Sequence, residues 1–285
     1  NCLLFEKKDP QDILIKGGVI KDIASKIKAD NLPIIDADFH FVTPPFVDSH
    51  FHMDATLSYG LPRVNKSGTL LEGIKLWGEL KPNLTADAIK ERALKFCKWA
   101  IARGTLAIRS HVDVSGQNLV GVEALLDVRE TMKDFIDIQL VAFPQDGLLR
   151  ANCLDNLNTA LDMGVDVVGG IPHFERTMEE GHESIRILCE IAEKRGLLTD
   201  LHCDETDDPM SRHVEKLALE TTRLGLNGRV AGSHLTSMHS IDNYYFTKLI
   251  SLLVEADLNI IANPLINITI PVSYTHLRAH ETCLD

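Results

Sequence analysis

The sequence predicts an α/β fold: a (β/α)8 TIM-like barrel, incomplete, with about seven visible strands. Short apolar strands alternate with longer helical patterns, which is typical of parallel βα folds. Polar residues end most strands and recur at intervals of about 30 residues, the length of a βα unit. A doubly wound open sheet could give similar spacing, but it does not usually place potential ligands at so many strand ends. In a barrel these ends meet in one mouth, where active sites lie.

The first barrel strand is predicted to end at His50, and the following strands can be placed from their apolar runs. These are Thr105–His111, Ile136–Pro144, Val165–Pro172, Leu197–His202, Val230–His234 and Leu258–Pro264. Segments Ala86–Arg103 and Ser184–Arg195 have helical periodicity, and each is followed by a glycine stop signal. The gap between His50 and the next strand end is about twice the usual interval. We therefore expect Leu57–Trp77 to be a long loop over the mouth.

The first 43 residues have a different pattern. Asp12–Ile20 reads as a hairpin around Gly17-Gly18, and Ile34–Asp36 reads as another strand. This pattern predicts part of a small flanking β-domain at residues 1–43, followed by the barrel at residues 44–270.

Composition narrows the functional class. The net charge of −12, without a basic stripe, argues against nucleic acid as the main partner and favours a small-molecule substrate. No apolar run approaches the roughly 20 residues that span a bilayer, so no membrane partner is expected. Six cysteines without a Cys-x-x-Cys pair indicate reduced thiols and a cytoplasmic location; they are Cys2, Cys97, Cys153, Cys189, Cys203 and Cys283.

Three histidines and a glutamate indicate a metal site for hydrolysis. His50 and His52 are two residues apart in a strand and so project from the same face, where both can bind one ion. His202 ends a distant strand, and Glu205 follows it closely. Zinc or iron held by two or three imidazoles lowers the pKa of water toward roughly 7. A His-x-His pair is also common in structural strands, but here it lies where a buried strand opens into solvent, which favours the metal site.

A specific resemblance is carried by motifs that occur in order along the chain. They are Pro44-Pro45-Phe46-Val47-Asp48-Ser49-His50-Phe51-His52-Met53-Asp54, Ser67-Gly68-Thr69-Leu70, Phe143-Pro144-Gln145, Ile171-Pro172-His173-Phe174-Glu175, His202-Cys203-Asp204-Glu205 and Ser233-His234-Leu235-Thr236-Ser237-Met238-His239-Ser240. From about residue 11 to residue 270, the chain resembles the bacterial cytosine deaminases of the amidohydrolase superfamily. The resemblance implies hydrolysis of cytosine to uracil and ammonia in pyrimidine salvage. It also implies one divalent iron or zinc ion and, for the full-length parent, a homo-oligomer.

The resemblance also implies roles for single residues. The metal ligands would be His50, His52 and His202, whereas Glu205 would shuttle protons and His234 would face the attacked carbon. Alternatively, His234 could be a further ligand or a core histidine.

Two more residues would contact the substrate. Gln145 and Leu70 are the implied substrate-binding residues, because a glutamine carries both the donor and the acceptor that suit the cytosine edge. Capping of a loop is the structural alternative for Gln145.

Other polar residues are expected to have lesser roles. Those at two further strand ends would support the site without binding metal; they are His111, Asp113, His173 and Glu175. The fourth strand lacks the lysine that bridges two ions in dihydroorotases and hydantoinases, and the chain lacks the Pro-Cys-x-x-Cys signature of zinc nucleoside deaminases. His213 and His239 are expected at the surface.

The resemblance stops after Ile270. In the family, an eighth strand would supply an aspartate as the fourth metal ligand, and no residue here matches it. Residues 271–285 resemble a translated sequencing adapter and are excluded from the fold prediction, so the pair His276 and His280 is assigned no function.

Two alternatives remain open at this point. The chain could be a sister amidohydrolase acting on another amino-heterocycle, such as isoguanine, creatinine or a triazine. It could also be an inactive fragment, because the aspartate of the eighth strand is missing.

Overall fold

The computed structural model describes residues 1–28 and 31–269, so the predicted tail at residues 271–285 lies outside the described residues. The chain divides into two compact units, with the boundary between Phe46 and Val47. This boundary is close to the one expected from the sequence at residue 43.

The first unit contains two small sheets. Strands β2 (Asp12–Lys16) and β3 (Val19–Ala24) form the expected antiparallel hairpin around Gly17-Gly18. Strands β1 (Leu3–Leu4) and β4 (Phe41–Val42) pair in parallel. The strand predicted at Ile34–Asp36 was wrong. Nothing in this segment covers the two isoleucine side chains, which are 76% and 94% exposed, so their apolar character does not mark a buried strand.

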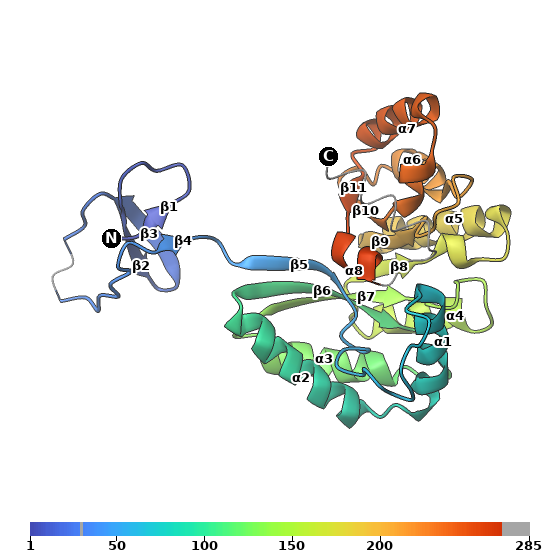
Figure 1. Ribbon diagram of the computed structural model, residues 1–285, viewed down its shortest axis with the longest axis horizontal. Helices are drawn as coiled ribbons and strands as arrows, with labels where there is room; N and C mark the ends of the chain where they lie inside the picture. The colour runs from blue at the N-terminus through green and yellow to red at the C-terminus, as the bar shows by residue number, and fades with distance from the viewer. Residues whose placement is uncertain (29–30, 270–285) are drawn as a thin grey trace. The chain divides into compact units, whose positions relative to one another are not determined.

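The second unit is built on a seven-stranded sheet that curves into a nearly closed barrel (Figure 1). Its strands are β5 (Phe46–Phe51), β6 (Thr105–Asp113), β7 (Asp137–Phe143), β8 (Val167–Gly170), β9 (Leu198–Cys203), β10 (Val230–His234) and β11 (Asn259–Ile261). They follow one another in chain order, and each neighbouring pair from β6 to β11 is parallel. The predicted incomplete α/β barrel is therefore confirmed.

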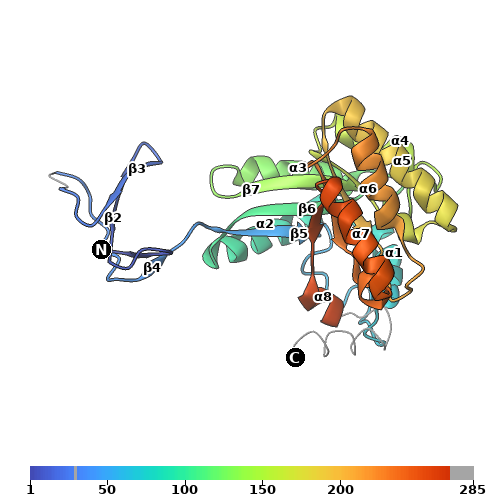
Figure 2. The ribbon, with the colours of Figure 1, turned by 90° about the horizontal axis from the view of Figure 1, so that it is seen from above.

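Helices follow these strands, and most of them cover the outside of the sheet (Figures 1 and 2). They are α1 (Leu70–Leu80), α2 (Ala86–Ala102), α3 (Val120–Met132), α4 (Cys153–Asp162), α5 (Met178–Arg195), α6 (His213–Arg223), α7 (Asn243–Glu255) and α8 (Pro264–Thr269). The expected glycine stops are confirmed: Gly104 and Gly196 follow α2 and α5 with φ angles of 84° and 68°. Among the described helices, none has the length and apolar character needed to cross a membrane.

Helix α1 corrects the prediction of a loop at Leu57–Trp77. The Thr69 hydroxyl accepts a hydrogen bond from the backbone N–H of Glu72 at 3.3 Å and so caps the helix N-terminus. Leu76 is buried by the packing of the helix. The capping threonine and the apolar spacing after it were visible in the sequence, but the long interval between strand ends led to the loop prediction.

A single apolar core lies between the sheet and the outer helices. Strands β7 and β8 are buried along most of their length, as expected for parallel strands that are covered on both faces. The five cysteines within the described residues are free and buried, in agreement with the reduced thiols expected from the sequence.

The close approach of β7 and β8 gives a stability test. A Cβ atom added at Gly169 would lie 2.5 Å from the backbone oxygen of Ala142, which the sheet holds in place. We expect Gly169→Ala to lower the free energy of unfolding by about 1–3 kcal/mol, measured by urea denaturation. Gly78→Ala is the matched control, because its Cβ would meet nothing within 4 Å and alanine favours a helix by up to about 1 kcal/mol. Equal stability of the two variants would contradict this packing.

Candidate metal and active site

Four histidine side chains converge at the carboxyl-terminal ends of the strands. They are His50 on β5, His52 directly after it, His111 on β6 and His202 on β9. Each offers one ring nitrogen, and these four atoms all lie within 4.8 Å of one another. The parallel sheet explains this convergence, because the same ends of neighbouring strands meet at one edge.

The ring nitrogens face each other at short distances. Nε2 of His52 lies 3.1 Å from Nε2 of His202, and Nε2 of His50 lies 3.2 Å from Nε2 of His234. Burial, together with the neighbouring histidines, holds the pKa of His50, His52 and His202 well below its usual range, so these imidazoles are neutral near pH 7. Neutral imidazoles offer lone pairs to a divalent ion.

This geometry fits a metal ion. Two imidazole nitrogens on a tetrahedral zinc ion, each about 2.0–2.1 Å from it, lie roughly 3.3–3.4 Å apart, close to the 3.1 Å between the Nε2 atoms of His52 and His202. Both ring nitrogens of His111 and Nδ1 of His202 are buried and make no hydrogen bond within the described part of the chain. The cluster can therefore hold a metal ion.

His111 revises the interpretation drawn from the sequence. It was expected to support the site from outside, yet its ring belongs to the cluster and lies 4.4 Å from the His50 ring, centroid to centroid. Its place at a strand end was visible in the sequence, but the direction of its side chain was not.

Glu205 and His234 lie together beside the cluster. Oε1 of Glu205 lies 3.1 Å from Nδ1 of His234 and accepts a hydrogen bond from the Asn267 amide at 2.9 Å. Burial raises the pKa of Glu205 to about 8 and lowers that of His234 to about 4, so both side chains favour their neutral forms. Asn267, on α8, was not singled out in the sequence, because no spacing relates it to the other strand ends.

A cavity of about 970 Å³ opens above the histidines. Gln145 follows β7 and Leu70 begins α1, and both line this cavity, as do Ile74 and Phe174. The structure thus places the two residues expected to bind substrate in the same cavity as the cluster. The residues that α1 contributes to the lining are largely apolar, whereas the imidazoles and Glu205 contribute polar groups.

Asp113 holds α1 at the edge of this cavity. Its Oδ2 atom accepts hydrogen bonds from Nε1 of Trp77 at 2.6 Å and from Nζ of Lys81 at 3.3 Å. Asp113 therefore fixes the position of the helix that lines the cavity. Within the part of the chain that the structure describes, these hydrogen bonds go to Trp77 and Lys81 and not to an imidazole of the cluster.

The two polar residues after β8 also line the cavity. His173 is half-buried, and its partial removal from water lowers its pKa to about 4. Oε1 of Glu175 accepts a hydrogen bond from the Leu149 backbone N–H at 3.2 Å. Both lie beside the cluster without belonging to it.

His213 was expected at the surface, and that prediction was wrong. It is 3% exposed, and its Nδ1 atom lies 2.8 Å from Oδ1 of Asp204. The histidine begins α6, and the buried carboxylate after β9 needs a donor there, which explains the burial. His239 is exposed, as expected.

Comparison with known proteins places this architecture in a family. Residues 33–281 match the amidohydrolase family model. The chain belongs to the amidohydrolase family. This match confirms the superfamily that the sequence motifs resemble.

Several individual relatives are similar over most of the chain. N-isopropylammelide isopropyl amidohydrolase from Pseudomonas sp. (strain ADP) is 34% identical over 82% of this chain and 59% of its own length. Pterin deaminase from Rhizobium rhizogenes is 29% identical over 90% of this chain and 59% of its own length. The crystal structure of 5-methylcytosine deaminase from Klebsiella pneumoniae, liganded with phosphonocytosine, has a TM-score of 0.89 and 38% identity. This structural match covers 95% of this chain and 67% of the Klebsiella chain. This chain thus spans about three fifths of the length of the Pseudomonas and Rhizobium relatives.

Proposed function

We propose that this chain carries the active site of a metal-dependent hydrolase that removes an amino group from a small nitrogen heterocycle, with cytosine-like pyrimidines as the first candidates. The observation that carries the proposal is the histidine cluster directly beside the buried Glu205 and His234, in a family whose relatives include deaminases.

The metal ligands in this proposal are His50, His52 and His202, with His111 as a fourth candidate. A divalent ion held there would act as a Lewis acid and lower the pKa of water toward about 7. Imidazole ligands suit both zinc and iron, so either ion is compatible with this site.

Glu205 and His234 handle the protons and the developing charge. In its ionised form, the Glu205 carboxylate can take a proton from the attacking water and deliver it to the ring nitrogen. It can then carry a second proton from the newly added oxygen to the leaving amino group, which departs as ammonia. His234 stands 3.1 Å from that carboxylate and can stabilise the charge that develops at the attacked carbon. The side chains of His234 and Glu205 are only 4% and 7% exposed, which limits the water that could compete for these protons.

Gln145 gives the site a means of recognising a pyrimidine edge. Its amide carries both a donor and an acceptor, which match the adjacent N–H and C=O groups of cytosine. Leu70 and the apolar face of α1 would pack against the ring. The likeness to the Klebsiella 5-methylcytosine deaminase favours a pyrimidine.

A sister substrate is the second candidate. The relative from Pseudomonas is named for N-isopropylammelide, and a cavity of about 970 Å³ has room for a substituted triazine. Isoguanine and creatinine, considered from the sequence, belong to the same class of amino-heterocycles.

A product assay with a substrate panel tests the proposal. The chain and a chimera, in which residues from 270 onward are replaced by the corresponding segment of the Klebsiella enzyme, would be loaded with zinc or ferrous iron. We expect ammonia release from cytosine or 5-methylcytosine. If isopropylamine is released from N-isopropylammelide but no ammonia from the pyrimidines, the sister substrate is favoured. Activity only in the chimera would mean that the chain needs a further segment. No product from any heterocycle with either protein would contradict the proposed function.

A further inference from the structure

A chain of buried polar groups runs beneath the histidine cluster. The Asp200 carboxylate on β9 is fully buried. Its Oδ1 atom accepts a hydrogen bond from the Ser233 hydroxyl at 2.8 Å, and its Oδ2 atom accepts one from Nη1 of Arg109 at 2.9 Å. On the other side, Oγ of Ser233 lies 3.1 Å from Nδ1 of His50. These contacts link three strands to one metal-ligand candidate.

The direction of the hydrogen bonds follows from the chemistry of the groups. A hydroxyl carries one hydrogen, and an ionised carboxylate can only accept, so the Ser233 hydrogen is directed to Asp200. The Ser233 oxygen is then free to accept, and the hydrogen bond to His50 requires a proton on Nδ1 of His50. A neutral imidazole protonated at Nδ1 has its lone pair on Nε2, the atom that faces the Nε2 atom of His234.

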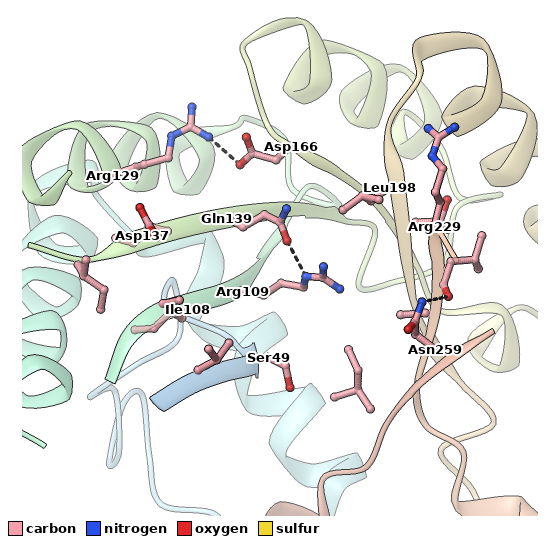
Figure 3. Close-up of a pocket in the computed structure, with 18 of the residues that line it drawn as sticks. Ser49, Ile108, Arg109, Arg129, Asp137, Gln139, Asp166, Leu198, Arg229 and Asn259 are labelled. Carbon is pink, nitrogen blue, oxygen red and sulfur yellow. Dashed lines mark hydrogen bonds and ion pairs between the residues drawn. The ribbon is translucent and has the colours of Figure 1, made fainter. Parts of the chain in front are cut away.

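Arg109 anchors this arrangement from the far ends of the strands. Its Nε atom donates to Oε1 of Gln139 at 2.7 Å, and both residues line a second cavity at the amino-terminal ends of the strands (Figure 3). The Arg109 guanidinium forms an ion pair with the Asp200 carboxylate at 2.9 Å, which leaves the other carboxylate oxygen as the acceptor for Ser233.

We propose that Asp200 and Ser233 are positioning residues that hold His50 in the tautomer with hydrogen on Nδ1 and so orient its Nε2 lone pair toward the metal site. Arg109 holds the Asp200 carboxylate in place. This inference rests on the metal site of the proposed function, but it concerns the state of one imidazole before any substrate binds. Partners behind a ligating histidine commonly contribute about 10–100-fold to metal affinity.

The tautomer of His50 can be measured directly in the metal-free chain. Ring-nitrogen NMR shifts of protein labelled with 15N-histidine distinguish the two neutral tautomers, and a His50→Asn variant assigns the His50 signals. We expect His50 to carry its hydrogen on Nδ1 in the wild-type chain at pH 7, and to lose this preference in Ser233→Ala. A wild-type His50 with its hydrogen on Nε2 would overturn the proposal. This NMR measurement needs no variant other than His50→Asn, which assigns the signals.

Zinc affinity gives a second readout. Competition with a chromogenic chelator should show about 10–100-fold weaker binding to Ser233→Ala than to the wild-type chain. Thr199→Val is the matched control, since it also removes a buried hydroxyl, on neighbouring β9, that makes no hydrogen bond within the described part of the chain. We expect its affinity to stay at the wild-type value.

The outcomes separate a positioning role from simple packing and from a failed functional assignment. Equal losses of affinity in Ser233→Ala and Thr199→Val would mean that packing alone is affected, and unchanged affinity in Ser233→Ala would also overturn the proposal. Neither measurement uses a heterocycle, so the tautomer and the zinc affinity can be interpreted even if the deamination assay fails. Conversely, an active deaminase whose His50 tautomer does not respond to Ser233 would contradict only this inference.

Discussion

Replacing Glu205 with glutamine should lower turnover by at least about 100-fold and by as much as about 10⁴-fold, while metal binding is retained. Glutamine keeps the shape of the side chain and an oxygen that can accept the hydrogen bond from Asn267. It cannot accept and return a proton, which is the role proposed for this carboxylate. The measurement is the rate of ammonia release, together with metal content, in whichever form of the protein turns over.

Glu175→Gln is the matched control for this change. Glu175 is also a buried carboxylate that lines the same cavity, but it accepts its hydrogen bond from the Leu149 backbone N–H and lies outside the histidine cluster. We expect its effect on turnover to stay below about tenfold, or about 1.4 kcal/mol. Unchanged turnover in Glu205→Gln would remove Glu205 from the mechanism, whereas loss of bound metal would show that its role is structural.

The strand ends were the part of this protein most accessible to sequence reasoning. A βα unit has a fixed approximate length, so strands repeat at a regular interval, and their ends face one mouth. The sequence alone therefore predicts that His50, His202 and His234 lie at one end of the barrel. The spacing of two residues also placed His52 beside His50, because side chains alternate along a strand.

The directions of individual side chains could not be predicted in the same way. His111 ends a strand like several other polar residues, and only the packed barrel turns its ring into the cluster. Asp200 and Ser233 lie within apolar strands, two residues before His202 and one before His234, with no spacing that pairs them. Their partnership depends on the register between β9 and β10, which brings Ser233 level with His202.

Helix α1 and the buried His213 illustrate a different difficulty. A long interval between strands is compatible with a loop or with a loop followed by a helix, and only the Thr69 cap distinguished them. His213 follows a polar segment of the sequence, so its sequence context indicates the surface. Its burial is a tertiary effect that depends on a carboxylate nine residues away.

That carboxylate gives the largest stability effect that we expect. Asp204 is fully buried, and its two oxygens accept hydrogen bonds from the Ser211 hydroxyl, from the backbone N–H groups of His213 and Val214, and from the His213 ring. These contacts tie the end of β9 to the first turn of α6. Asp204→Ala would leave the donors buried without partners, and we expect the free energy of unfolding to fall by about 3–5 kcal/mol.

The matched comparison for Asp204→Ala is an aspartate that makes a similar contact at the surface. Asp242 caps α7 by accepting a hydrogen bond from the Tyr245 backbone N–H at 2.9 Å, and water can replace it there. Asp242→Ala should therefore cost only about 1 kcal/mol in the same urea denaturation experiment. If the two variants lost equal stability, the buried network around Asp204 would not be holding β9 and α6 together. A larger loss in Asp204→Ala would instead mean that the loop carrying Glu205 depends on this carboxylate, because Glu205 is the next residue in the chain.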